Sequence, residues 1–274
     1  TTCVRAAAFR PNWVPTNIDT QTYIFDNDPT RKALPVLSLV STDLHDREGP
    51  LSVELINSDP DLGPGFQIDC ESERHSRSAY RLKFKAEFGT VPLTSPFFEA
   101  APLFADSAPT RFERLVLRLS SNNPVTYIAE PWTRTTQLAM SGPGCGGHSM
   151  YMHFYLNGIY QGLINPVERP DAWFAATYFG GEFEDYFAVN HHELSWRGNH
   201  YLSGDPNSYE LLLEIAEQKQ LEEPANYELF RQLCDITQFA DYTILYWYSG
   251  FGDGVDNNYY AFMRPDTSDG NTAI

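Results

Sequence analysis

The sequence has no long apolar run and few basic residues. None of its 274 residues belong to an apolar stretch of the roughly 20 positions that a membrane-spanning helix needs, and no basic-plus-apolar leader opens the chain. We therefore expect a mature, soluble segment without a membrane span. Lysine and arginine number 19 against 36 acidic residues, a net charge of −17. This charge disfavours nucleic acid and favours cations or basic protein segments, or it only keeps the surface solvated.

Cysteine is also scarce. The four cysteines are widely spaced and form no CxxC pair, so a zinc site is not expected. One or two disulfides and buried free thiols are both compatible with this number. An even count in an acidic, lysine-poor chain favours an extracytoplasmic location.

Several catalytic signatures are missing. The glycine cluster at 141–147 has neither GxGxxG nor GxxxxGK[ST] spacing, which favours a connector over a phosphate cradle. His191, His192 and Glu193, in the segment 184–204, lack the HExxH spacing, and we predict that they are loop residues. Aromatic residues make up 14% of the chain, as in carbohydrate-binding modules, but no carboxylate pair has a glycosidase context, so that class ranks last.

Short strands with turn signals fill the first two thirds of the chain. In 80–85 the alternation is strict, so that the aromatic and aliphatic residues face a core and Arg81, Lys83 and Lys85 face the other way. This basic face could contact phosphates or could simply be solvated. Asn157-Gly158 between two alternating runs predicts a type I′ hairpin. The expected strands are 34–40, 51–56, 65–70, 79–85, 112–119, 151–156 and 159–164.

Helical patterns dominate the last third. A first helix is expected over 130–140, and further ones follow Glu168-Arg169-Pro170-Asp171, over 208–218 and over 226–234. The run 239–248 carries apolar residues on every side, which predicts a helix buried all round and capped by Asp235 or Thr237. Strands followed by helices suggest an α+β fold, with a small sheet lobe, a helical lobe and a cleft between them.

The loop after that last helix is rich in glycine, carboxylates and amides. Asp253, Asp256, Asn257 and Asn258 lie between the helix and a strand at 259–262. Such oxygens suit a hard divalent cation, although the same residues also make ordinary turns.

Nine short segments form an ordered series along the chain. They are LPVLSL (34–39), YRLKFK (80–85), FG (88–89), LR (117–118), WTRTTQ (132–137), YLNGIYQG (155–162), NPVERPD (165–171), DY (241–242) and DGVDNN (253–258). Taken together and in this order, they resemble the CotH family of spore-coat-type atypical protein kinases. The opening 1–25 also resembles the end of a secreted β-sandwich module, which suggests a piece of a longer protein.

The resemblance implies a protein-kinase-like two-lobed fold over 26–274, with a small antiparallel sheet lobe over about 30–165 and a helical lobe over about 166–274. It further implies binding of ATP with Mg²⁺ or Ca²⁺, and phosphorylation of serine on secreted or surface proteins. The alternative is an inactive domain of the same fold that binds calcium as a surface or scaffolding module.

By position, the resemblance makes Asp253 the catalytic and metal-binding aspartate and Asn258 a second metal ligand. Glu168 is implied to line the nucleotide cleft. Arg77 stands where the family has a phosphate-binding lysine, and Lys83 lies on the basic strand face.

The sequence departs from the family at its C-terminal side. The family's second metal-binding aspartate has no counterpart before Ile274, so we expect the domain to be C-terminally incomplete. Asp266 and Asp269 lie in a predicted turn, and we expect both to be far from Asp253.

Overall fold

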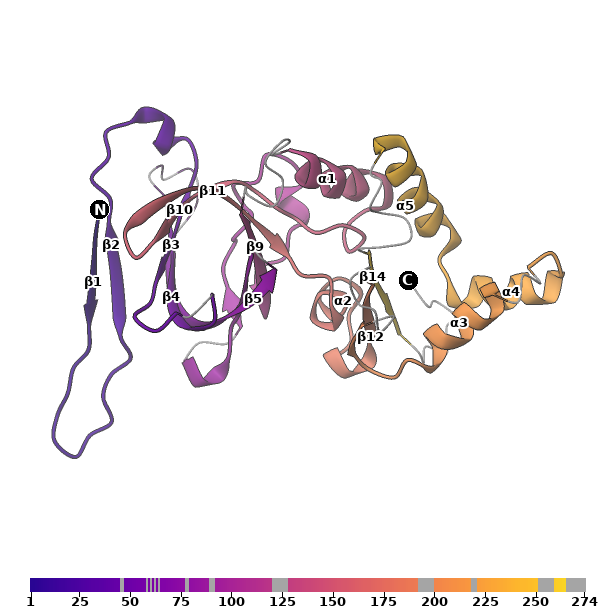
Figure 1. Cartoon of the computed structure of the whole chain (residues 1–274), viewed down its shortest axis with the longest axis horizontal. Helices are drawn as coiled ribbons and strands as arrows, with labels where there is room; N and C mark the ends of the chain where they lie inside the picture. The colour runs from indigo at the N-terminus through magenta and orange to yellow at the C-terminus, as the bar shows by residue number, and fades with distance from the viewer. Residues whose placement is uncertain are drawn as a thin grey trace. The chain divides into compact units, whose positions relative to one another are not determined.

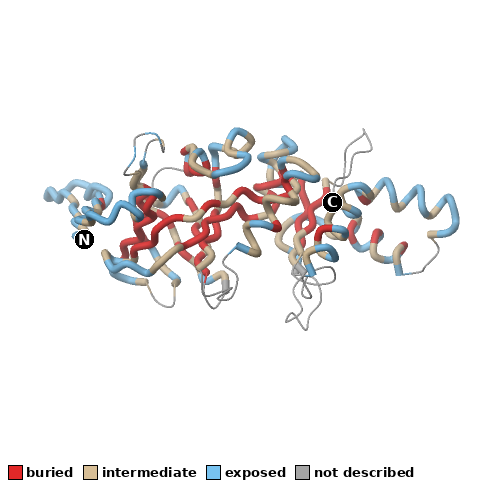
Figure 2. The backbone as a smooth tube through the Cα atoms, turned by 90° about the horizontal axis from the view of Figure 1, so that it is seen from above, coloured by how far each residue is buried: buried red, intermediate tan, exposed pale blue. Residues whose placement is uncertain are grey.

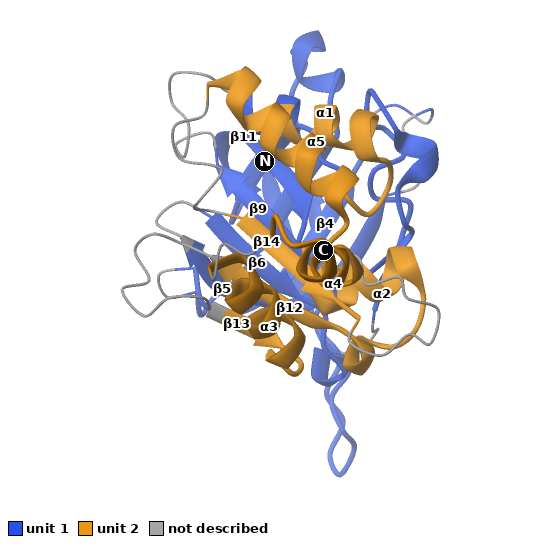
Figure 3. Cartoon of the chain, turned by 90° about the vertical axis from the view of Figure 1, so that its right-hand side faces the viewer, with its two compact units in different colours: residues 1–132, 148–169 blue, residues 133–147, 170–274 orange. Residues whose placement is uncertain are grey.

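The structure is a computed structural model that describes residues 1–44, 47–57, 59, 61, 63, 65–76, 79–88, 92–119, 128–191, 200–217, 221–250 and 259–264. The chain forms two compact units, coloured separately in Figure 3. Unit 1 contains Thr1–Trp132 and His148–Arg169, and unit 2 contains Thr133–Gly147 and Pro170–Ile274.

Unit 1 is built on a closed barrel of seven strands (Figure 1). Neighbouring strands are antiparallel except for the first and the last, which pair in parallel with His153 beside Val36 and Leu156 beside Leu39. This parallel pair closes the sheet on itself. In order around the barrel, the strands are β3 (Val36–Val40), β4 (Gly49–Ile56), β5 (Phe66–Ser76), β6 (Ala79–Lys83), β9 (Arg114–Leu119), β11 (Ile159–Glu168) and β10 (Met152–Leu156).

The barrel contradicts the expected kinase-like fold. The described residues form a mixed α/β protein with this closed barrel and five α-helices, so the prediction of a two-lobed kinase-like fold with a small sheet lobe is wrong. The strands themselves are close to those expected from alternation. What alternation does not encode is which strands pair, and here β3 pairs with β10 across a large separation in sequence.

The barrel core takes one face of β6, as the alternation in its sequence predicts, whereas every residue of β3 is buried. In β6, Tyr80 and Leu82 are buried while Arg81 and Lys83 are partly exposed, as predicted. Figure 2 shows where the buried residues lie along the backbone. A short two-stranded sheet, β7 (Leu93–Thr94) and β8 (Arg111–Phe112), lies beside an aromatic cluster that belongs to the same core. The cluster comprises Phe97, Phe98 and Phe112, with ring centroids 5.0–6.1 Å apart.

An additional hairpin packs on the outside of the barrel. It consists of β1 (Thr2–Ala6) and β2 (Asp19–Tyr23), which are antiparallel. The hydroxyl of Thr20 donates to Ser52 Oγ at 2.9 Å, and the Thr22 amide donates to Glu54 Oε1 at 3.1 Å. Polar side chains therefore attach this hairpin to β4.

The turn between β10 and β11 has the predicted type I′ character. Both central residues have positive φ, 50° at Asn157 and 77° at Gly158, as this turn requires. The Asn157 side-chain oxygen also accepts a hydrogen bond from the Ser41 amide at 2.9 Å. The turn thus fixes the β10–β11 register and contacts the end of β3.

Replacing Gly158 with valine is expected to lower the free energy of unfolding by about 1 kcal/mol or more, because a β-branched residue is strained at positive φ. A Cβ at this position would also lie 3.4 Å from Cys3 Sγ. Urea denaturation measures the loss, and Gly158→Asn is the control because asparagine tolerates this conformation. Equal stability of the two variants would contradict the strain argument.

Unit 2 combines a three-stranded antiparallel sheet with helices. The sheet order is β13 (His200–Ser203), β12 (Phe187–His191), β14 (Tyr259–Met263). His191, which we expected in a loop, is the last residue of β12, while His192 and Glu193 lie outside the described residues. Most of α1 (Ala129–Ser141) belongs to this unit, together with α2 (Ala172–Phe179), α3 (Asn207–Glu217), α4 (Pro224–Leu233) and α5 (Ile236–Ser249).

Helix α5 does not have the burial that its sequence suggests. Its start is as predicted, since Asp235 caps it by accepting from the Gln238 amide at 3.0 Å. However, only Leu245 of this helix is buried, and Trp247 and Tyr248 are 73% and 83% exposed. The prediction of burial on every side is therefore wrong. Nowhere in the described part of the chain is a helix long and apolar enough to cross a membrane.

Each of the four cysteines, all of them within the described residues, is a free thiol. Cys70 and Cys234 are buried, and Cys3 and Cys145 are partly buried. Burial raises the pKa of Cys145 and of Cys234 to about 11. Of the two alternatives that the sequence left open, the structure has buried thiols rather than disulfides.

Candidate functional site

Two of the predicted site residues, Lys83 and Glu168, can be placed in the structure. Both belong to unit 1, on β6 and β11, with β9 between these strands. Asp253, Asn258 and Arg77 lie outside the described residues, and so do Asp266 and Asp269.

The register puts Lys83 and Glu168 on opposite faces of the barrel sheet. Leu115 of β9 is opposite both Leu82 and Glu168, so these three residues share one face. Lys83 follows Leu82 in β6 and therefore points to the other face. The structure thus does not bring the two predicted nucleotide-binding side chains together.

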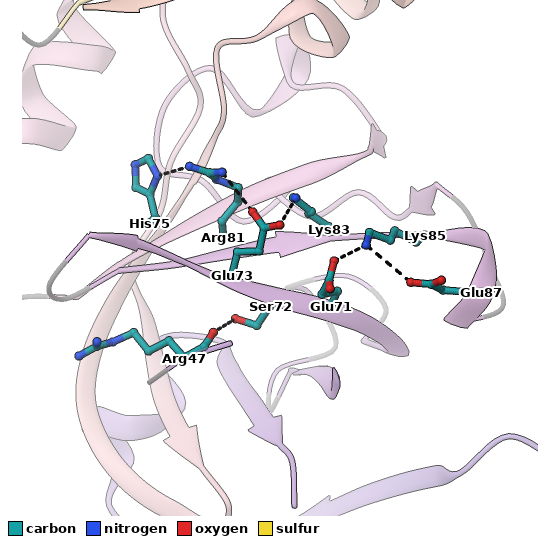
Figure 4. A network of polar contacts seen from close by, with 9 residues as sticks. All are labelled: Arg47, Glu71, Ser72, Glu73, His75, Arg81, Lys83, Lys85 and Glu87. Atoms are coloured by element: carbon teal, nitrogen blue, oxygen red, sulfur yellow. Dashed lines mark hydrogen bonds and ion pairs between the residues drawn. The ribbon is translucent and has the colours of Figure 1, made fainter. Parts of the chain in front are cut away.

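The outer face at Lys83 carries a network of cations and carboxylates (Figure 4). It arises because an acidic strand, β5, runs antiparallel to a basic strand, β6, with Glu73 opposite Arg81 and Glu71 opposite Lys83. Glu73 forms ion pairs with Lys83 and with Arg81, whose Nη1 lies 3.2 Å from the carboxylate. Lys85 forms an ion pair with Glu71 in the same way.

The network extends along both strands. Arg81 Nη2 lies 3.0 Å from His75 Nδ1, and Lys85 Nζ lies 3.6 Å from the Glu87 carboxylate. Cations and carboxylates therefore alternate on this surface, and the basic face predicted from the sequence is partly neutralised by its neighbour strand. On the opposite face of β5, the hydroxyl of the buried Ser72 donates to the Arg47 carbonyl at 2.7 Å.

The cations change the titration of Glu73. Burial raises the pKa of this carboxyl, but the hydrogen bond and charge of Lys83, together with the charges of Arg81 and Lys85, outweigh burial and hold the pKa below its ordinary value. The hydrogen bond to Glu71 raises the pKa of Lys85. Both shifts favour the charged forms.

We expect Glu73 to stabilise the fold at pH values above the pKa that a glutamate has in the unfolded chain. This stabilisation should be lost as the pH falls through the pKa of Glu73 in the folded state, which is lower. The measurement is the difference in urea stability between the wild type and Glu73→Gln, at pH values from 7 down to 3. The difference should be largest near neutral pH and shrink in acid. A difference that does not vary with pH would show that the ion pairs add nothing.

Glu168 belongs to a different, buried chain of hydrogen bonds. Its Oε2 accepts from the His148 amide at 2.8 Å and lies 2.8 Å from His148 Nδ1. On the other side of the ring, His148 Nε2 lies 3.0 Å from Ser107 Oγ. His148 and Glu168 are both almost fully buried. The segment before β10 is thereby tied to the end of β11.

This order of serine, histidine and carboxylate resembles a hydrolase triad, but the hydrogen bonds favour a structural role. The Ser107 hydroxyl donates to the Phe104 carbonyl at 2.9 Å. The Ser107 amide donates to the Phe104 carbonyl, and the Ala108 amide donates to the Ala105 carbonyl. Neither amide N–H is therefore directed at a position where an oxyanion could form. We interpret this series of hydrogen bonds, from Ser107 through His148 to Glu168, as a structural feature that holds the Glu168 side chain in place, and we call it the polar clamp.

Neither arrangement is easy to predict from the sequence. Glu73 could have been paired with β6 from the alternating charges on two strands that are close in sequence. His148, by contrast, follows a glycine cluster, and nothing local indicates that it contacts Glu168, 20 residues further along the chain.

In the parts of the chain that the structure describes, no group of three or more His, Cys, Asp or Glu side chains could hold a metal ion. The predicted ligands Asp253 and Asn258 are not among those parts. Compared with protein-family models and with curated protein sequences, the chain matches neither.

Proposed function

We propose that this chain is related to the CotH family and transfers phosphate from ATP to serine on secreted or surface proteins. The ordered series of segments from Leu34 to Arg264 supports the relationship. The proposal concerns the chemistry and not the kinase-like fold, which the barrel excludes.

The observation that carries the proposal is the ion pair between Lys83 and Glu73. In protein kinases, a strand lysine that contacts the nucleotide phosphates is held by a glutamate. Here the glutamate comes from the neighbouring strand, and Arg81 shares it. The Lys83 side chain is 21% exposed, and its ammonium group has three donors, so it can keep Glu73 and still contact a phosphate.

The resemblance to the CotH family assigns roles to further residues. Asp253 would accept the serine hydroxyl proton and, with Asn258, hold Mg²⁺ or Ca²⁺, which neutralises charge on the transferring phosphoryl group. Arg77, close to Arg81 in sequence, would add a second cation for the phosphates. Glu168 has an indirect role, because its carboxylate is engaged with His148 on the opposite face of the barrel.

The test is phosphate transfer from labelled ATP with Mg²⁺ and a serine-containing acceptor protein. We expect Lys83→Ala to lower the rate by about 100-fold or more, as loss of a preorganised charge at a transferring group typically does. Lys85→Ala is the matched control, because Lys85 lies two residues away on the same face and pairs with Glu71 instead. Equal rates for the two variants would remove Lys83 from the site.

The same assay distinguishes the proposed kinase from the inactive alternative. If the wild type transfers no phosphate and Ca²⁺ alone raises the melting temperature, the chain is a calcium-binding module. An extracytoplasmic location is part of the proposal, since the acceptors would be secreted or surface proteins, and the calcium-binding alternative is likewise a surface or scaffolding module.

A further inference from the structure

The loop between β1 and β2, residues 7–18, contains one arginine, Arg10, and no acidic residue. We call it the hairpin tip. The first 18 residues contain two arginines, Arg5 and Arg10, and no acidic residue, whereas all 36 acidic residues follow from Asp19 onwards. The hairpin tip therefore has a charge of +1 in a chain of net charge −17, so it is the tip and not the chain as a whole that suits an anionic surface.

The hairpin tip has a defined conformation. The Trp13 amide donates to the Arg10 carbonyl at 3.1 Å, with Pro11 and a left-handed Asn12 (φ 67°) between them, the arrangement of a type II turn. At its base, the Ala8 amide donates to Thr16 Oγ1 at 2.8 Å. The apex side chains are therefore held in place although no core lies behind them.

The apex presents large apolar side chains to solvent. Phe9, Trp13 and Val14 are 78%, 65% and 93% exposed. The Arg10 guanidinium lies over the Trp13 ring, 4.9 Å from its centroid, so a cation accompanies the aromatic surface. Figure 1 shows the tip extending past the ends of β1 and β2, away from the barrel strands on which the hairpin packs. Exposing these side chains costs free energy unless another surface covers them.

We propose that the hairpin tip inserts into the interface of an anionic lipid bilayer. Tryptophan and phenylalanine favour the headgroup region, where one part of the ring is apolar and the other is hydrated. Val14, the most exposed of the three, suits acyl chains better than a glycan, on which aromatic rings stack. Arg10 would contact lipid phosphates, while the acidic remainder of the chain is repelled by the membrane.

This inference is independent of the proposed function, because it rests on unit 1 residues outside the Lys83 network. It places the protein at a membrane surface through one loop. Binding should consequently be reversible and weakened by salt, as expected for shallow insertion combined with charge attraction.

The experiment is cosedimentation of the whole chain with vesicles of phosphatidylcholine alone and of phosphatidylcholine with phosphatidylglycerol. We expect binding to the anionic vesicles, reduced about tenfold or more by Phe9→Ser with Trp13→Ala, since two apolar anchors are lost. Trp247→Ala is the matched control, because Trp247 is as exposed but belongs to unit 2. Arg10→Glu should weaken binding to the anionic vesicles only.

The melting temperature of each variant shows whether it still folds, and the tip lies outside the barrel core. Three results would overturn the proposal: no binding to anionic vesicles, equal binding to both vesicle types, or a double variant that binds like the wild type. Retained binding of Trp247→Ala together with loss in the double variant supports it.

Discussion

Replacing His148 with alanine is expected to lower the free energy of unfolding by about 3–5 kcal/mol, the usual cost of removing one member of a buried polar pair. The ring is 2% exposed and bridges Glu168 and Ser107. In the variant, the Glu168 carboxylate still accepts a hydrogen bond from the backbone amide of residue 148 but loses its contact with the imidazole ring. A buried carboxylate with too few hydrogen-bond partners destabilises the folded state.

Urea denaturation followed by circular dichroism measures this loss. Ser107→Ala is the control, because it removes only the partly exposed hydroxyl at one end of the polar clamp. It should lower the free energy of unfolding by about 1 kcal/mol. A double-mutant cycle with Glu168→Gln should show that the losses are not additive. If His148→Ala and Ser107→Ala cost the same, Glu168 is satisfied by other groups and the clamp interpretation is wrong.

The local elements could be predicted from the sequence because they depend on neighbouring residues. Alternation identified β6 and its two faces, and Asn157-Gly158 fixed the β10–β11 turn. The closure of the barrel could not be predicted, because pairing of β3 with β10 is decided by packing between distant segments. The burial predicted for helix α5 was wrong for a related reason. Apolar residues on every side of a helix indicate burial only where other elements cover each side.

For the candidate site, the sequence predicted residue types better than their surroundings. It placed Lys83 on a basic face but not the acidic strand β5 beside it. It singled out Glu168 at the end of a strand but not the histidine that contacts it. Both gaps concern contacts between segments, and it is these contacts that decide whether a charged side chain is available to a ligand.

Phe98 shows the same limit and gives the last prediction. It lies in the irregular segment 95–101, where the sequence predicts no strand or helix, yet it is fully buried at 0% exposure. Its ring centroid lies 5.0 Å from that of Phe97, 5.6 Å from that of Phe112 and 6.2 Å from that of His148. This one side chain therefore connects the barrel core to the polar clamp.

Phe98→Ala is expected to lower the free energy of unfolding by about 3–5 kcal/mol, through lost burial and the cavity that remains. The segment cannot easily collapse into that cavity, because its own hydrogen bonds, including Ala101 N–H to the Phe98 carbonyl at 2.9 Å, fix the backbone. Phe25→Ala, at an 80% exposed position, should change stability by no more than about 0.5 kcal/mol. Urea denaturation of both variants tests this. A small loss at Phe98 would mean that the aromatic cluster rearranges freely and does not hold the His148 ring in place.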